Sequence, residues 1–311
     1  MSRKRIWCAA LALCILAAML SGCRIDLSIG LGDLLTGEEY PDAAQYQAGA
    51  FTYRAEEITA VEVYWRSGAV TITESDEPEL SVKESGGALS EEIAMHHYLD
   101  GSVLRIRFCK SGARVHVNAE DKRLSLAVPK QIELSVHTTS ADIKADTLEQ
   151  KSVLLSAHSG ETELGAVTAD EVDLSSSSGA IRADSVAAQT FRCSASSGKL
   201  ELGTVATGTL DCETSSGDVT VDSMTAGTAQ VTTSSGSVEL TLTEAPSVNI
   251  RTSSGGVDLT LAAGGAEVRH SAHSGKLRTS RPYDRKGDLY VFGSGESKIT
   301  VETSSGNLKI E

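Results

Sequence analysis

Large side chains are scarce in this sequence. Aromatic residues make up 4% of the 311 residues, and only 5 residues are proline, whereas 28 are glycine. So few aromatic side chains would fill the core of a β-sandwich or β-barrel of this size poorly, whereas a long, narrow core of Val, Leu and Ile needs fewer large residues. The length allows one or two domains, and the composition favours strands joined by turns.

Cysteine is also rare in the part of the chain that would fold. Of six cysteines, two lie within the first 22 residues and one is Cys23, which leaves Cys109, Cys193 and Cys212. These three thiols have no Cys-x-x-Cys motif and no histidine at metal-ligand spacing. We therefore expect no metal site and no other cofactor.

A long apolar run occurs only near the N-terminus. Basic residues at positions 3–5 precede an apolar stretch over residues 6–20, which is typical of a secretory signal and too short for a comfortable membrane span. The stretch ends in Leu20-Ser21-Gly22-Cys23, which resembles the lipobox of bacterial lipoproteins.

The lipobox resemblance predicts where the protein resides. It implies that residues 1–22 are a lipoprotein signal peptide and that the Cys23 thiol carries diacylglycerol. Residues 23–55 then form the lipidated cysteine and its tether, with two or more acyl chains for stable anchoring. We expect an exported protein, lipid-anchored to the bacterial cell membrane and facing outside the cytoplasm. An ordinary secretory signal with an incidental cysteine is the alternative.

Basic side chains are few relative to acidic ones. Removal of the signal leaves 25 basic and 42 acidic residues, a formal charge of −17. Because such a surface repels nucleic acid and anionic lipid, neither is an expected partner.

A short turn motif recurs through the second half of the chain. His-Ser-Gly or Ser-Ser-Gly returns at 19-residue steps through six copies, and then after 20 and 31 residues. The motif ends at Gly160, Gly179, Gly198, Gly217, Gly236, Gly255, Gly275 and Gly306. A degenerate first copy, Thr139-Ser140-Ala141, lies one step earlier. We expect each of these glycines to form a sharp structural turn with positive φ.

Alternation of apolar and polar residues on both sides of each glycine predicts strand, turn, strand in every unit. Units this short must stack to bury their apolar faces. The predicted fold is an all-β, right-handed, single-chain parallel β-solenoid with coils of about 19 residues. Residues 56–130 are predicted to be its irregular β-rich N-terminal part, and residues 131–311 the regular solenoid with an insertion near 281–295.

Two of the remaining cysteines are one repeat apart. Cys193 and Cys212 share an inward column, so they would stack on adjacent coils about 4.8 Å apart, within the range of a disulfide. Parallel side chains in register rarely offer the required torsion. We favour buried, stacked thiols, with a disulfide as the alternative.

Histidines and carboxylates form no predicted metal site. His158 and His273 lie too many repeats apart to share an ion, and the His96-His97 pair lacks a third ligand nearby. The acidic residues that follow turn glycines do not form the Gly-Gly-x-Gly-x-Asp repeats of calcium-binding solenoids. They are Asp142, Glu161, Asp218 and Asp258.

The repeats resemble a known family. Thr-Ser-Ser-Gly followed by Asp, Ser or Gly and then Val occurs at 214–221, 233–240 and 252–259. This pattern, with Ser-Gly-x-Val at 67–70 and Leu-x-Val-Pro at 126–129, resembles a large bacterial family of putative adhesins over roughly residues 56–311. The resemblance implies a β-solenoid and brings no catalytic residues. The chain departs from the pattern at Ala141, at the 20-residue step to Gly275 and in the insertion before Gly306.

These features predict a non-enzymatic cell-envelope lipoprotein that displays a β-solenoid surface for adhesion or for binding of glycan or protein. Its expected partners are the membrane, through the lipid anchor, and a cell-wall glycan or an envelope protein. One alternative is an envelope-stress sensor or scaffold. The other is a glycan-active β-helix enzyme, which would need carboxylates converging on a groove.

Overall fold

The computed structural model describes residues 39–86, 90–113, 122–262 and 264–311. The predicted signal peptide and Cys23 lie outside these ranges. In the described part there are two 3-10 helices, η1 (Ala43–Gln45) and η2 (Ala55–Glu57), and no α-helix. No described helix is long and apolar enough to cross a bilayer.

The strands join into one continuous sheet. They are β1 (Gln47–Ala48), β2 (Phe51–Arg54), β3 (Ala60–Trp65), β4 (Ala69–Glu74), β5 (Glu79–Ser85), β6 (His96–Asp100), β7 (Val103–Arg107), β8 (Arg123–Val128), β9 (Glu133–Thr138), β10 (Asp142–Glu149), β11 (Ser152–Ala157), β12 (Thr162–Ser176), β13 (Ile181–Ala195), β14 (Leu200–Thr214), β15 (Val219–Thr233), β16 (Val238–Glu244), β17 (Ser247–Thr252), β18 (Val257–Thr260), β19 (Gly265–Ala272), β20 (Leu277–Thr279), β21 (Asp284–Lys286), β22 (Leu289–Gly293), β23 (Ser297–Thr303) and β24 (Leu308–Ile310).

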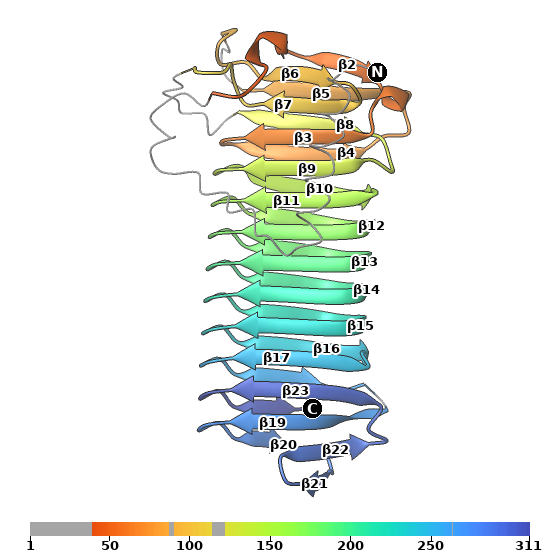
Figure 1. The fold of residues 1–311 in the computed structure, drawn as a ribbon, viewed down its shortest axis with the longest axis vertical. Helices are drawn as coiled ribbons and strands as arrows, with labels where there is room; N and C mark the ends of the chain where they lie inside the picture. The colour runs from red at the N-terminus through yellow and green to blue at the C-terminus, as the bar shows by residue number, and fades with distance from the viewer. Residues whose placement is uncertain (1–38, 87–89, 114–121, 263) are drawn as a thin grey trace, which may run out of the picture.

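Successive coils stack in parallel register, as Figure 1 shows. Leu174 of β12 lies opposite Cys193 of β13, which lies opposite Cys212 of β14, so that partners differ by 19 positions. The predicted all-β solenoid is therefore confirmed. Its right-handed coiling stays a prediction.

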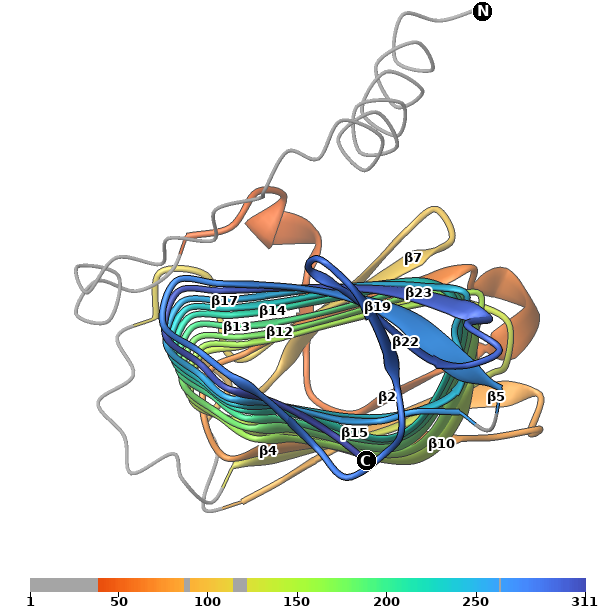
Figure 2. The same cartoon turned by 90° about the horizontal axis from the view of Figure 1, so that it is seen from below.

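Two walls make up the cross-section, as the end view in Figure 2 shows. The strands β12 to β15 bend, so that their first halves lie in one wall and their second halves in the other. The first half of β12 pairs with β10, and its second half pairs with β11. We call the wall that contains β3, β9, β11, β17 and the second halves wall A. Wall B contains β4, β10, β16, β18 and the first halves.

The core is the narrow space between the walls. Because side chains alternate across a strand, every second residue points inward, and register turns these residues into ladders. One ladder runs along wall B and is buried throughout. It consists of Ala145, Leu164, Ala183, Leu202, Val221, Leu240 and Leu259. Burial of these aliphatic columns supplies the main driving force for stacking.

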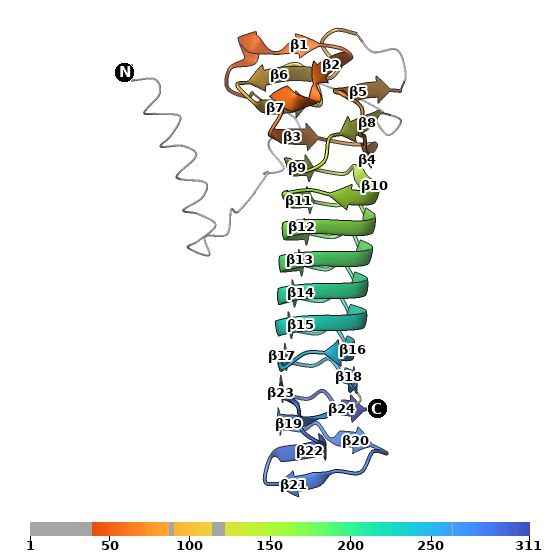
Figure 3. The ribbon, with the colours of Figure 1, turned by 90° about the vertical axis from the view of Figure 1, so that its right-hand side faces the viewer.

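The last coil of the sequence lies within the stack. In wall A, β23 pairs in parallel with β17 on one side and with β19 on the other. In wall B, β24 likewise lies between β18 and β20. The coil of β19 and β20, which comes earlier in the sequence, is therefore displaced one position outward (Figure 3).

The N-terminal end is arranged in the same way. The coil of β3 and β4 pairs directly with β9 and β10, whereas β7 and β8 pair with its outer side. Residues 61–72, which contain the Ser-Gly-x-Val of positions 67–70, thus lie in a coil of the stack. At the N-terminal end, the coil of β7 and β8 thus covers the coil of β3 and β4, which precedes it in the chain. At the C-terminal end, the coil of β19 and β20 covers the coil of β23 and β24, which follows it.

Residues 39–55, which fall within the predicted tether, pack against this end of the solenoid. The Tyr40 hydroxyl donates to the carbonyl of Cys109 at 3.0 Å, and the Tyr40 and Tyr46 rings lie 4.7 Å apart. Strand β2 pairs antiparallel with β5. The folded part therefore begins before residue 56, because aromatic side chains in this segment find a buried surface.

The predicted insertion near 281–295 is a hairpin of β21 and β22. Strand β22 pairs antiparallel with β19 and so covers the open edge of wall A. Phe292 is fully buried and Tyr290 nearly so, and both cover the end of the apolar core. Such a cap is required because an uncovered coil would expose apolar side chains and unpaired backbone groups.

Candidate binding surface

The Thr-Ser-Ser-Gly motif forms a compact turn between walls A and B. Its threonine points inward, and the hydroxyl accepts a hydrogen bond from the amide of the glycine three residues later. The distance is 3.1 Å for Thr214 with Gly217 and 3.0 Å for Thr233 with Gly236. The two serines between them are exposed and line one edge of the solenoid. A buried threonine thus satisfies a backbone donor that the turn leaves unpaired.

The glycine of each turn is required for a reason other than the predicted one. None of the eight repeat glycines has positive φ, so that expectation is wrong. A Cβ atom on Gly217 would instead come closer than 3.0 Å to the carbonyl oxygen of Gly198 on the neighbouring coil. The same clash would occur at every other repeat glycine. Glycine is needed because the turns of adjacent coils stack too closely for any side chain.

Cys193 and Cys212 are stacked in the core as free thiols. They are register partners in β13 and β14, and each is at most 1% exposed. Burial raises the pKa of Cys212 to about 12, and burial also raises that of Cys193. Both groups therefore stay protonated near neutral pH and act as small apolar side chains.

A column of alternating charge runs along the outside of wall B. Lys144, Glu163, Arg182 and Glu201 stand in register on four successive coils. Lys144 pairs with Glu163 at 2.7 Å, and Arg182 pairs with Glu201 at 2.5 Å. The hydrogen bond from Lys144 lowers the pKa of Glu163. Each exposed pair contributes little to stability. Their order along the column gives the wall a fixed pattern of charge.

The histidines and carboxylates named above do not come together. His158 and His273 are exposed at turn positions, whereas His96 and His97 are buried near the N-terminal end. The Tyr53 hydroxyl lies 3.1 Å from Nδ1 of His97, and burial lowers the pKa of His97 to about 4. Within the described ranges, no group of three His, Cys, Asp or Glu residues could hold a metal ion.

Two of the four acidic residues that follow the turn positions support the backbone of the next coil. The carboxylate of Asp142 accepts a hydrogen bond from the amide of Glu161 at 2.9 Å, and that of Asp218 accepts one from the amide of Ser237 at the same distance. These two side chains are thus part of the coil-to-coil ladder.

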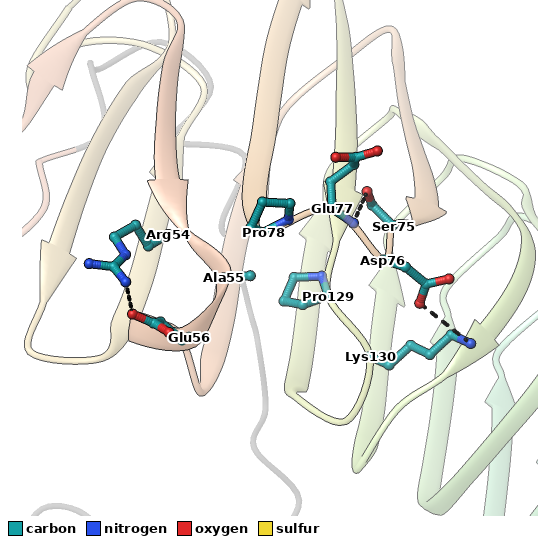
Figure 4. Close-up of a pocket in the computed structure, with 9 residues that line it drawn as sticks. All are labelled: Arg54, Ala55, Glu56, Ser75, Asp76, Glu77, Pro78, Pro129 and Lys130. Atoms are coloured by element: carbon teal, nitrogen blue, oxygen red, sulfur yellow. Dashed lines mark hydrogen bonds and ion pairs between the residues drawn. The ribbon is translucent and has the colours of Figure 1, made fainter.

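A shallow hollow of about 350 Å³ lies where the N-terminal strands leave the stack (Figure 4). Lys130 pairs there with Asp76 at 3.8 Å, and Arg54 pairs with Glu56. Both basic groups of the lining are thus paired with carboxylates, and Glu77 is the remaining charged group, so the hollow offers no converging acid and base. It is lined by Arg54, Ala55, Glu56, Ser75, Asp76, Glu77, Pro78, Pro129 and Lys130.

These observations define a class of protein before any relative is considered: an all-β solenoid whose regular surface is two polar walls. The model of the Toastrack DUF4097 family matches residues 58–311. The chain therefore belongs to the Toastrack DUF4097 family. The match covers most of the region in which the repeats resemble the bacterial putative adhesins.

Solved structures give more distant likenesses. A putative adhesin from Parabacteroides merdae is 13% identical, with 85% of this chain and 96% of the other covered and a TM-score of 0.44. A putative adhesin from Bacteroides fragilis is 10% identical, with 84% and 96% covered and a TM-score of 0.42. A putative lipid binding protein from Parabacteroides distasonis is 13% identical, with 85% and 97% covered and a TM-score of 0.38. No curated protein matches the chain.

Sequence reasoning missed two features of this surface. The charge column of wall B is visible in the sequence as basic and acidic residues alternating at 19-residue steps. The second is the hydrogen bond from four of the turn glycines to a threonine three positions earlier, which the sequence shows as the Thr-x-x-Gly spacing that ends at Gly217, Gly236, Gly255 and Gly306.

Proposed function

We propose that this protein is a non-enzymatic envelope lipoprotein that displays the outer surface of its solenoid for adhesion or for binding of glycan or protein. The lipid anchor at Cys23 would hold it on the bacterial membrane, with the solenoid outside the cytoplasm. Membership of the Toastrack DUF4097 family supports the solenoid fold on which this role depends.

The observation that carries this proposal is the register of the outward-facing side chains. Across β12 to β15, residues on adjacent coils stay in step over most of both walls. Rows of side chains therefore repeat at the spacing of strands, about 4.8 Å, on a rigid scaffold. A flat, ordered wall of this kind fits an extended partner.

The first experiment is a binding measurement with residues 24–311, the chain that follows the predicted lipidated cysteine. Purified cell-wall glycan and whole envelope extract would be offered separately, and the glycan would then be analysed for cleavage. Saturable binding without cleavage supports the proposal. Cleavage of the glycan would establish an enzyme instead. Specific capture of one envelope protein without glycan binding would favour the sensor or scaffold.

The anchor requires its own test, because Cys23 lies outside the described residues. Cys23→Ala should release the protein from the membrane fraction, since only the cysteine thiol accepts the lipid. Cys193→Ala is the matched control, because it removes a buried thiol and leaves the lipobox unchanged. Unchanged membrane association of Cys23→Ala would contradict lipid anchoring.

A further inference from the structure

Charge is distributed unevenly along the solenoid. Residues 131–262 contain six basic and eighteen acidic residues, a formal charge of −12. Residues 275–290, which form β20 and most of the terminal hairpin, contain five basic and two acidic residues, a formal charge of +3. The C-terminal cap is thus a basic tip on an acidic column, at the opposite end from the aromatic N-terminal segment (Figures 1 and 3).

Basic residues in the coils and in the tip differ in their partners. All six basic side chains between residues 131 and 262 form ion pairs: Lys144, Lys151, Arg182, Arg192, Lys199 and Arg251. In the tip, by contrast, Lys276, Arg278 and Lys286 are exposed and have no ion pair with any described carboxylate. Basic groups are therefore neutralised by neighbouring carboxylates throughout residues 131–262, whereas these three groups of the tip are available to a ligand.

Like charges also lie side by side in the tip. Arg278 of β20 is the register partner of Lys309 in β24. Adjacent cations in register repel each other and lower stability, so an external anion would relieve that cost. Lys309 is partly neutralised by Glu311 at 2.5 Å, whereas Arg278 has no such partner among the described residues.

An exposed aromatic ring accompanies these charges. Among the described residues, Tyr283 is the one large apolar side chain that is exposed, at 45%. Its ring is held at 5.4 Å from Tyr290 and 5.6 Å from Phe292, and the Arg285 guanidinium lies over the Tyr290 ring at 5.2 Å. The inner side of the Tyr283 ring thus packs against the cap, and its outer side is available to a ligand.

From this juxtaposition we infer that the basic tip at residues 276–286 is the binding site for an acidic glycan. Carboxylates of the polymer pair with Lys276, Arg278 and Lys286, and a sugar ring packs on Tyr283. Guanidinium and ammonium groups supply charge-assisted hydrogen bonds, and an aromatic ring supplies a flat apolar face for a sugar. A single exposed ring provides little to insert into a bilayer, so a glycan fits the tip better than a lipid surface. This inference rests on the proposed function and specifies its site and partner.

The test compares two triple variants with the same charge change. K276Q/R278Q/K286Q neutralises the tip, and K144Q/R192Q/K199Q neutralises two lysines and one arginine on the walls. Each is titrated with polygalacturonate, a linear uronic acid polymer, and with neutral dextran. Y283A is measured as well, with thermal unfolding to show that each variant is folded. Vesicles of phosphatidylglycerol serve as the other anionic surface.

The tip variant should raise the Kd for polygalacturonate about tenfold or more, because three pairings are lost, while the wall variant stays within about twofold. Y283A should weaken binding without changing its salt dependence, and dextran should bind weakly or not at all. Equal loss in both triple variants would overturn the inference, as would binding of the vesicles without binding of polygalacturonate. If the wild type binds envelope glycan and the tip variant binds it equally well, the display function is supported and the tip is refuted as its binding site. Absence of binding to any envelope component would refute the display function itself.

Discussion

Gly306 stacks directly on Gly255, although Gly275 lies between them in the sequence. A Cβ on Gly306 would clash with the Gly255 carbonyl, and one on Gly275 would clash with the Gly306 carbonyl, so the spatial order is 255, 306, 275. The amide of Ser305 donates to the carbonyl of Ser253 at 3.0 Å, and Arg251 pairs with Glu302 at 2.9 Å. The coil that closes the sequence is thus held between two coils that come before it.

This order predicts unusual protection of the last coil. Amides of β23 should exchange with solvent at least about tenfold more slowly than those of β20, because β23 has a strand on each side, whereas β20 pairs with β24 alone among the described strands. Hydrogen exchange with mass spectrometry on the native protein measures both segments. Exchange of β23 as fast as that of β20 would contradict the interposed position.

The turn glycines should be intolerant of alanine for steric reasons. Gly217→Ala should destabilise the protein by about 2–3 kcal/mol, because its Cβ would overlap the backbone of the neighbouring coil. Gly256→Ala is the control, since the nearest atom to a Cβ there is 3.9 Å away. Urea unfolding of both variants checks this prediction. Equal stability of the two variants would show that the turns do not stack as described.

The buried threonine of the motif should also contribute to stability. Thr233→Val keeps the shape of the side chain but leaves the amide of Gly236 without its 3.0 Å acceptor, at a cost of about 1–2 kcal/mol. Thr232→Val, on the outward side of the same strand, should change stability by less than about 0.5 kcal/mol. Thermal or urea denaturation measures both variants. Unchanged stability of Thr233→Val would show that this hydrogen bond does not stabilise the protein.

The buried imidazole of His97 should make the protein less stable in mild acid. Burial lowers its pKa from 6.5 to about 4, so below pH 6.5 the unfolded chain binds a proton that the folded protein does not bind. Stability should therefore fall as the pH is lowered from 6.5 to 4, by about 2 kcal/mol from this residue. His97→Gln stays neutral and can still contact the Tyr53 hydroxyl.

Urea unfolding at pH 7 and at pH 4.5 measures the effect of His97. The wild type should lose more stability between the two values than His97→Gln does, because all other titrating groups are common to both. An identical loss in the two proteins would mean that the imidazole is protonated in the folded state, contrary to its burial.

Much of the fold could be predicted from the sequence because each coil repeats the same pattern. The apolar column through Leu202 and Leu240 and the turns at Gly217 and Gly236 follow from spacing alone, since strand alternation and stacking leave one consistent register. The reason for the glycines could not be predicted in this way. A turn with positive φ and a turn packed against its neighbour both exclude a side chain, and only coordinates distinguish them.

The candidate site was less predictable. Lys276, Arg278 and Lys286 look like ordinary surface residues in the sequence, because their lack of ion pairs depends on which coils lie beside them. Tyr283 stood within the predicted insertion, but its support by Tyr290 and Phe292 depends on how the hairpin folds over the core.

By itself, the sequence determined the strand pattern, the inward columns and the step of 19 residues, because these depend on side chains that are close along the chain. Only the tertiary structure decided the order of the coils at each end, where Gly306 comes to lie between Gly255 and Gly275. The backbone hydrogen bonds of a parallel ladder are nearly independent of side chains, so several coils would fit the same edge. The cap of β21 and β22, which covers the end of the core with Phe292, selects one arrangement among them and thereby leaves the basic tip outermost.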